Sequence, residues 1–304
     1  MRKPVDESVL LARAYLSRVG EPGSFPLWSF IDREGPIEAA RAIRCADAPD
    51  RVLAETTARR ETADAVADLD AAERHGARLV VPESDDWPYV AFGALRRVAA
   101  PTKPGVCALV PPTALWVRGN GDLARVDARS VAVVGARAAT SYGTHVTAEM
   151  CFGLASQGVV IVSGGAYGID AAAHRAALAA NGATVIVSAG GVDRPYPPSS
   201  ASLYDRALEN GLVVSESPPG SAPHRSRFLS RKYDLDREHS RCSYDSENEV
   251  RVVRTHQHQR SEHAQDRDTA SGPSQARRAT RLRRGGRVRR RRPHCLQGRE
   301  QTRL

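Results

Sequence analysis

The sequence SVAVVGARAATSYG occupies residues 130–143, where a run of apolar residues passes through Gly135 into a segment of helical composition. A strand that passes through glycine into a helix brings free backbone N–H groups and the positive end of the helix dipole to one point. Groups of this kind bind anions, and phosphate above all. The stretch therefore predicts an α/β fold with an anion site just after the strand.

Five further apolar runs of strand length flank this stretch, and helix-length amphipathic segments separate several of them. The runs begin near residues 77, 114, 158, 183 and 211, and the helical segments occupy about 141–157, 170–181 and 199–210. This alternation predicts a Rossmann-like parallel sheet with crossover helices, a doubly wound α/β domain, over residues 77–231. Ligands of such sheets bind at the carboxyl ends of the strands.

Residues 1–76 predict a small helical module that precedes the sheet. Residues 8–20 have helical spacing, with Ser8 as the expected cap and Gly20 as the stop. Two more helices are expected at 24–35 and 36–43. The stretch 50–75, rich in Ala, Arg and Glu, predicts one connecting helix.

The excess positive charge is confined to residues 232–304. Residues 1–231 hold 25 Lys and Arg against 25 Asp and Glu, whereas the last 73 residues hold 19 against 10. This tail has only eight Leu, Ile, Val or Phe, and it runs through RATRLRRGGRVRRRRP at 278–293, so it is predicted to be disordered. One alternative function is therefore a nonspecific nucleic-acid binder driven by residues 277–292.

The cysteines and the N-terminus indicate the compartment. The five cysteines show neither CxxC pairing nor histidines at zinc spacing, so reduced thiols are expected, without a disulfide framework or a metal site. Residues 2–7 are polar and charged, and no long apolar run follows, which argues against a signal peptide or a membrane span. We expect a cytoplasmic protein that does not bind membranes.

Two loops at predicted strand ends carry the first candidate site residues. In GARAATSYG the candidates are Gly135, the Arg137 guanidinium, which matches phosphate oxygens, and the Thr140 hydroxyl. In SGGAYGIDAAAH, residues 163–174, they are Ser163, Gly164 and Gly165, because glycines let a backbone approach a phosphate closely. Neither loop is a GxGxxG, and no acidic residue ends the second strand, so no dinucleotide cofactor is expected.

Each of these residues also has a purely structural interpretation. The second loop is also consistent with a tight turn in which Asp170 caps the next helix, and Arg137 with a solvated surface charge. His174 lies four residues after Asp170 and fits a hydrogen-bonded structural partner better than a catalytic base. No carboxylate pair and no activated serine or cysteine nucleophile is recognisable, so no enzymatic activity is expected.

A third candidate segment is PPGSAPHRSRFLSR, residues 218–231, after the last predicted strand. It places Arg225, Arg227 and Arg231 around Phe228. Cations that follow phosphates and a ring that stacks on a base suit single-stranded nucleic acid. The alternative is that Phe228 lies in the core and the arginines are solvated.

Together these motifs resemble the DNA-processing protein A family (DprA/Smf) in its actinobacterial form. The resemblance covers about residues 1–231, and the matching motifs are VAVVGARAATSYG, IVSGGAYGIDAAAHRAAL, AGGVDRPYPPSSASLYDRALENGLVVSESPPG and HRSRFLSR. It implies a helical module before a Rossmann-like domain that binds single-stranded DNA in a basic pocket, loads the RecA recombinase during natural transformation, and dimerises.

The resemblance also assigns roles by motif position. Gly135 and Arg137 match the family's phosphate contact, and Ser163, Gly164 and Gly165 match its second loop. Arg225, Phe228 and Arg231 match the basic and aromatic segment beside the pocket.

The resemblance ends abruptly after residue 231. The family continues with Asn-Arg and an apolar helix, whereas this chain reads KYDLDREHSRCSYDSENEV. The codons available to residues 255–260 permit a shifted frame that encodes Leu-Thr-Asn-Thr-Ser, similar to the family's next motif. We therefore predict a reading-frame shift near codon 232 that removes later strands, part of the pocket and the dimer surface. Impaired activity is expected, and the family's homodimer is doubtful for this chain.

A second alternative function is a related Rossmann-like enzyme, a nucleotide phosphoribohydrolase. That class shares a glycine loop but carries a glutamate after GGxGT. Here Gly165 is followed by AYGIDAAAH, with no glutamate.

Overall fold

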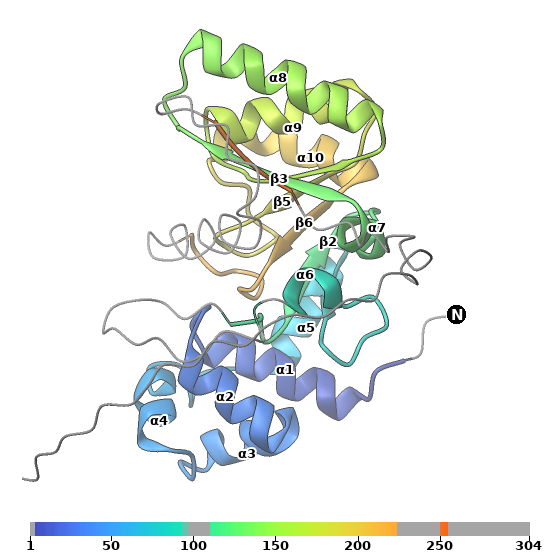
Figure 1. Cartoon of the computed structure of the whole chain (residues 1–304). Helices are drawn as coiled ribbons and strands as arrows, with labels where there is room; N and C mark the ends of the chain where they lie inside the picture. The colour runs from blue at the N-terminus through green and yellow to red at the C-terminus, as the bar shows by residue number, and fades with distance from the viewer. Residues whose placement is uncertain (1–3, 94, 96–109, 224–249, 255–304) are drawn as a thin grey trace, which may run out of the picture. The chain divides into compact units, whose positions relative to one another are not determined.

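A computed structural model describes residues 4–93, 95, 110–223 and 250–254 (Figure 1). These residues all belong to one compact unit that ends at His258. In the part of the chain so described, none of the helices has the length and apolar character needed to cross a membrane.

The N-terminal region is helical, as its sequence predicts. The helices are α1 (Glu7–Val19), α2 (Phe25–Glu34), α3 (Pro36–Arg44), α4 (Asp50–Thr56) and α5 (Ala65–Arg74). Helix α1 ends at Gly20 as expected, but its cap is Asp6, whose carboxylate accepts the Ser8 N–H at 2.8 Å. Ser8, the predicted cap, is therefore the second residue of the helix.

The single helix predicted over 50–75 is wrong, because this stretch forms α4 and α5 with a turn between them. The Thr56 hydroxyl donates to the Val52 carbonyl at 2.8 Å, and the Thr57 hydroxyl donates to the Leu53 carbonyl at 2.5 Å. Asp64 then starts α5 by accepting the Ala67 N–H at 3.0 Å. These short polar side chains serve helix ends better than helix interiors.

Among the residues that the structure describes, all six predicted strands are present, together with a seventh. They are β1 (Ala77–Val80), β2 (Leu115–Arg118), β3 (Ser130–Gly135), β4 (Val160–Gly164), β5 (Thr184–Val187), β6 (Leu212–Ser215) and β7 (Val250–Arg254), in the spatial order β1-β2-β6-β5-β4-β3-β7. Strands β3 to β6 are mutually parallel. Strand β2 runs antiparallel to β1 and β6, so the sheet is mixed and largely parallel.

Strand β7 comes from the segment that the sequence predicts to be disordered. It pairs antiparallel with β3 along all five of its residues, from Val250 beside Gly135 to Arg254 beside Val131. For residues 250–254 the structure therefore differs from the prediction. The remainder of 232–304 lies outside the described residues.

Three crossover helices connect the parallel strands on a single face of the sheet (Figure 1). They are α8 (Ser141–Ser156), α9 (Ile169–Ala179) and α10 (Ala201–Asn210), the last preceded by the short 3₁₀ turn Pro198–Ser200. Since β3, β4, β5 and β6 follow one another in space as in sequence, right-handed crossovers all fall on one side. The doubly wound arrangement is therefore wrong for this part of the sheet.

The packing of the two faces follows from this winding. Helices α8 and α9 bury Cys151, Ala155 and Ile169 against Val133 and Ile161. The opposite face carries Val162, Val185 and Val214, which share a cluster with Trp87 and Leu123. Trp87 lies before the short helix α6 (Tyr89–Gly93), and Leu123 begins α7 (Leu123–Ala128).

The N-terminal helices and the sheet share a third core. Tyr15, Leu16 and Ile43 belong to the same buried cluster as Trp116 of β2 and Val213 of β6. The Trp116 indole N–H also donates to the Ser17 hydroxyl at 3.3 Å. The helices of residues 1–76 are thus packed directly on the sheet that bears the candidate site.

The two cysteines among the described residues should differ sharply in reactivity. Cys151 is fully buried, and this burial raises its pKa to about 12, whereas Cys45 is exposed. At pH 8 a thiol of that pKa is ionised in roughly one molecule in ten thousand, and the thiolate is the nucleophile. Brief iodoacetamide treatment of the native protein is expected to label Cys45 and to spare Cys151, as read by peptide mass spectrometry. Equal labelling would contradict the buried placement.

Candidate functional site

The carboxyl ends of β3, β4, β5 and β6 all face one way, because these strands are parallel. We call this side of the sheet, with the loops that follow the four strands, the carboxyl edge. Loops 136–140, 165–168, 188–197 and 216–221 belong to it. Such an edge is where parallel α/β sheets bind ligands.

The first loop presents a charge to solvent. Gly135 is the last residue of β3, and Arg137 is exposed two residues beyond it. Thr140 is the cap of α8, where its hydroxyl oxygen accepts the Gly143 N–H at 3.1 Å. Arg137 is thus held on a short connection between a buried strand and a capped helix.

The second predicted loop lies deeper than its sequence suggests. Ser163 is fully buried, and its hydroxyl donates to the Val133 carbonyl at 2.5 Å, so it joins β4 to β3. Gly164 and Gly165 are buried as well. A Cβ on Gly165 would lie 2.2 Å from the Tyr204 hydroxyl oxygen, so packing against α10 already explains this glycine.

The first and second loops are locked together at Gly168. Its φ is +77°, and a Cβ there would lie 2.2 Å from the Ala136 carbonyl oxygen and 2.5 Å from that of Arg137. The Ile169 N–H, at the start of α9, donates to the same Ala136 carbonyl at 3.2 Å. Only a residue without a side chain fits here, and the contact fixes the backbone of Arg137 against α9.

The polar residues of α9 serve the fold. Asp170 is not the helix cap, which is Gly168, but its carboxylate accepts the Ala166 N–H at 3.4 Å across the loop. His174 is fully buried and hydrogen-bonds through Nδ1 to the Thr184 hydroxyl at 2.7 Å. That hydroxyl donates in turn to the Ile161 carbonyl at 2.7 Å. The hydrogen-bonded structural role predicted for His174 is confirmed.

Three exposed tyrosines at the carboxyl edge are absent from the sequence-based prediction. Tyr142 in the first turn of α8 is 74% exposed, Tyr167 in the second loop 54%, and Tyr196 in the third loop 38%. The Tyr167 hydroxyl lies 2.8 Å from the Ser199 hydroxyl, so the second loop contacts the turn before α10. The sequence did contain a signal for them, because one tyrosine follows each of the three consecutive strands β3, β4 and β5.

The third segment predicted from the sequence cannot be placed. Arg225, Phe228 and Arg231 lie outside the described residues. Within the described ranges, no three His, Cys, Asp or Glu side chains are grouped so that they could hold a metal ion.

Comparison with known sequences identifies relatives. Residues 101–233 match the family model described as DNA recombination-mediator protein A. A putative DNA processing protein DprA of Mycobacterium tuberculosis is 46% identical over 220 residues, which are 72% of this chain and 56% of that protein. The DNA processing protein DprA of Streptococcus pneumoniae is 41% identical over 120 residues, 40% of this chain and 42% of that one. The chain spans about half the length of these curated relatives.

A solved structure shares the architecture. The X-ray structure of DNA processing protein A from Streptococcus pneumoniae matches with a TM-score of 0.56 and 23% sequence identity. The match covers 76% of this chain and 75% of that one. This similarity confirms the predicted α/β fold with helices before the sheet.

Proposed function

Since the chain belongs to the DprA/Smf family of DNA recombination-mediator proteins, we propose that it binds single-stranded DNA along the carboxyl edge of its sheet. The observation that carries this proposal is the arrangement around Gly168, which fixes the exposed Arg137 beside a second loop bearing the exposed Tyr167. A guanidinium binds phosphate oxygens, and aromatic rings stack on unpaired bases. Single-stranded DNA offers both groups at once.

The preference for a single strand follows from the tyrosines. In a duplex the bases are stacked on one another, so rings at the protein surface cannot reach their faces. In a single strand each base can turn toward Tyr142, Tyr167 or Tyr196 while the backbone passes Arg137. The segment with Arg225, Phe228 and Arg231 is proposed to extend this interface, as its motif implies.

The direct test is a binding titration of the full chain with a fluorescent oligo(dT) and with a duplex of equal length, each at several salt concentrations. We expect tighter binding of the single strand, with an affinity that falls as salt rises. Equal or tighter binding of the duplex would contradict the proposal.

Tyr167→Ala is expected to weaken oligo(dT) binding about tenfold, since stacking on one base contributes roughly 1–3 kcal/mol. Tyr167→Phe keeps the ring and should bind nearly as the wild type does. Phe152→Ala is the matched control, because Phe152 is also 48% exposed but lies toward the other end of α8. A loss in Phe152→Ala as large as in Tyr167→Ala would exclude a specific stacking role.

We propose a binding role without catalysis, in which the polar residues of β4 and α9 serve the fold. Ser163 and His174 are fully buried and hydrogen-bonded inside the protein, and Asp170 closes its own loop. No member of this set is arranged as a nucleophile with its base. Delivery of the bound strand to the RecA recombinase, in the cytoplasm, is the cellular role that the family resemblance favours.

We further propose that the sequence after residue 231 reduces this activity, because it departs from the family pattern where the pocket should continue. A single-base change near codon 232 should restore a family-like frame, and the restored protein should bind oligo(dT) more tightly. If no such change restores the frame, or the restored protein binds no better, this part of the proposal is wrong.

A further inference from the structure

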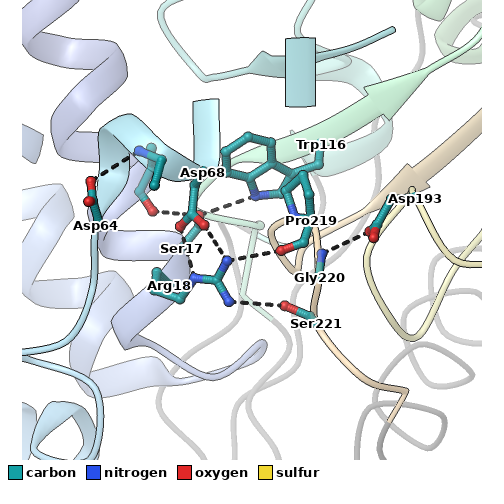
Figure 2. A network of polar contacts seen from close by, with 11 residues as sticks. Ser17, Arg18, Asp64, Asp68, Trp116, Asp193, Pro219, Gly220 and Ser221 are labelled. Atoms are coloured by element: carbon teal, nitrogen blue, oxygen red, sulfur yellow. Dashed lines mark hydrogen bonds and ion pairs between the residues drawn. The ribbon is translucent and has the colours of Figure 1, made fainter. Parts of the chain in front are cut away.

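The fourth loop of the carboxyl edge, residues 216–221, is held from outside the sheet by an arginine of helix α1. Figure 2 shows the Arg18 guanidinium between Asp68 of α5 and this loop. Its Nη2 donates to the Pro219 carbonyl at 3.0 Å, and its Nη1 lies 3.5 Å from the Ser221 hydroxyl. Arg18 therefore connects two N-terminal helices to a loop about 200 residues away in sequence.

The ion pair that orients Arg18 is largely shielded from water. Arg18 Nε donates to Asp68 Oδ2 at 2.8 Å, and Nη2 makes a second bond to the other carboxylate oxygen. The side chains are 25% exposed for Arg18 and 10% for Asp68. A two-pronged pair of this kind fixes the plane of the guanidinium, so the donors that remain point in one direction.

The same loop is bound on its other side to the third loop. The Gly220 N–H donates to the Asp193 carboxylate at 2.9 Å, and the Gly191 N–H donates to the Ser221 carbonyl at 2.9 Å (Figure 2 shows the first of these). A Cβ on Gly191 would lie 3.0 Å from the Pro218 carbonyl oxygen. The two loops are thus in direct backbone contact, and any shift of one displaces the other.

The third loop continues from Asp193 through the exposed Arg194 to Tyr196, which belongs to the proposed DNA interface. We propose that Arg18 and Asp68 are positioning residues for this interface. They hold the fourth loop, which holds the third loop and so sets the place of Arg194 and Tyr196. This inference rests on the proposed function, and it gives the N-terminal helices a part in DNA binding without contact to DNA.

The variant Asp68→Asn distinguishes a positioning role of Asp68 from a direct effect of its charge on DNA affinity, because the two predict changes of opposite sign. Removing a negative charge near a DNA site should strengthen binding if charge alone matters. The positioning role predicts the opposite, a loss of oligo(dT) affinity of about fivefold, because the neutral amide no longer orients Arg18. Glu38→Gln is the matched control, since Glu38 is also a helical carboxylate paired with an arginine, but at an exposed site on α3. It should bind as the wild type does.

Arg18→Lys is the second variant, because it keeps the charge but loses the planar fork that pairs with both carboxylate oxygens of Asp68 and so fixes the donor to Pro219. It should show the same loss, with faster hydrogen exchange in residues 188–193. The salt dependence of its affinity should be unchanged, since no phosphate contact is lost. All measurements are made on the full chain, well below each variant's melting temperature.

The outcomes are distinct. If the wild type binds oligo(dT) and Arg137→Ala weakens it, but Asp68→Asn and Arg18→Lys bind normally, the positioning role is wrong and the proposed function stands. If Asp68→Asn fails to fold, Arg18→Lys decides alone. If the wild type does not bind oligo(dT), both the function and this inference fail.

Discussion

Arg137→Ala is expected to weaken the binding of single-stranded DNA about thirtyfold. A hydrogen-bonded contact between charged groups contributes roughly 2 kcal/mol, and each 1.4 kcal/mol is a factor of ten in affinity. Arg137 is exposed at the end of β3, and its backbone is fixed by Gly168. The backbone of this loop therefore need not reorganise when the guanidinium meets a phosphate.

The salt dependence identifies the cause of this loss. Removing one phosphate contact should reduce the slope of log affinity against log salt by about 0.7 for a single strand. Arg137→Lys, which keeps the charge but not the planar fork, should lose less affinity and keep the slope. Anisotropy titrations at three or more salt concentrations measure both quantities.

The control for this variant lies at the other end of the same strand. Arg129 is also exposed, but it precedes β3 and so lies at the amino ends of the parallel strands. Arg129→Ala removes the same charge from the opposite edge of the sheet and should bind nearly as tightly as the wild type. Equal losses in the two variants would show that only net charge matters, which contradicts a site at the carboxyl edge.

Gly168→Ala is expected to destabilise the fold by roughly 3 kcal/mol or more. The added Cβ would meet two backbone carbonyl oxygens, at 2.2 and 2.5 Å, and neither can rotate away as a side chain could. The φ of +77° adds a backbone cost that only glycine escapes. Relief of the clash would push the first loop outward, so oligo(dT) affinity should fall with stability.

Gly153→Ala provides the matched control for this substitution. Gly153 lies within α8, and a Cβ there would have no atom within 4 Å. Alanine is a better helix residue than glycine, so this variant should gain about 0.5–1 kcal/mol. Thermal or urea unfolding compares the two. A Gly168→Ala protein with wild-type stability would show that the first two loops are not in contact as described.

Strands β1 to β6 were predictable from sequence because each is a short apolar run followed by a glycine or a turn, whereas β7 lies in a segment too poor in apolar residues to be recognised. The runs at 130–135 and 160–164 are buried along almost their whole length, which is why they have no polar alternation. Their order in space is not encoded in this pattern. The antiparallel direction of β2 and the single-sided winding therefore appear only in the structure.

The candidate site was predictable only in part, because the sequence shows where the glycines and polar residues are but not which atoms they contact. Gly165 and Gly168 both stand in a glycine-rich loop, but one makes room for Tyr204 and the other for the Ala136 carbonyl. Sequence alone does not separate a glycine that admits a ligand from one that admits a neighbouring side chain. The same holds for Ser163, whose hydroxyl bonds across two strands. The contact between Arg18 and Pro219 is even harder to predict from sequence, since the two residues are 201 positions apart in the chain.

Photo-crosslinking of the full chain to an oligonucleotide that contains 5-iodouracil tests the central claim most directly. Iodouracil reacts with aromatic rings that stack on it, and peptide mass spectrometry then locates the linked residues. We predict crosslinks at Tyr142, Tyr167 and Tyr196, reduced in Arg137→Ala. Crosslinks confined to residues 277–292, with none in the loops after β3, β4 and β5, would contradict the account.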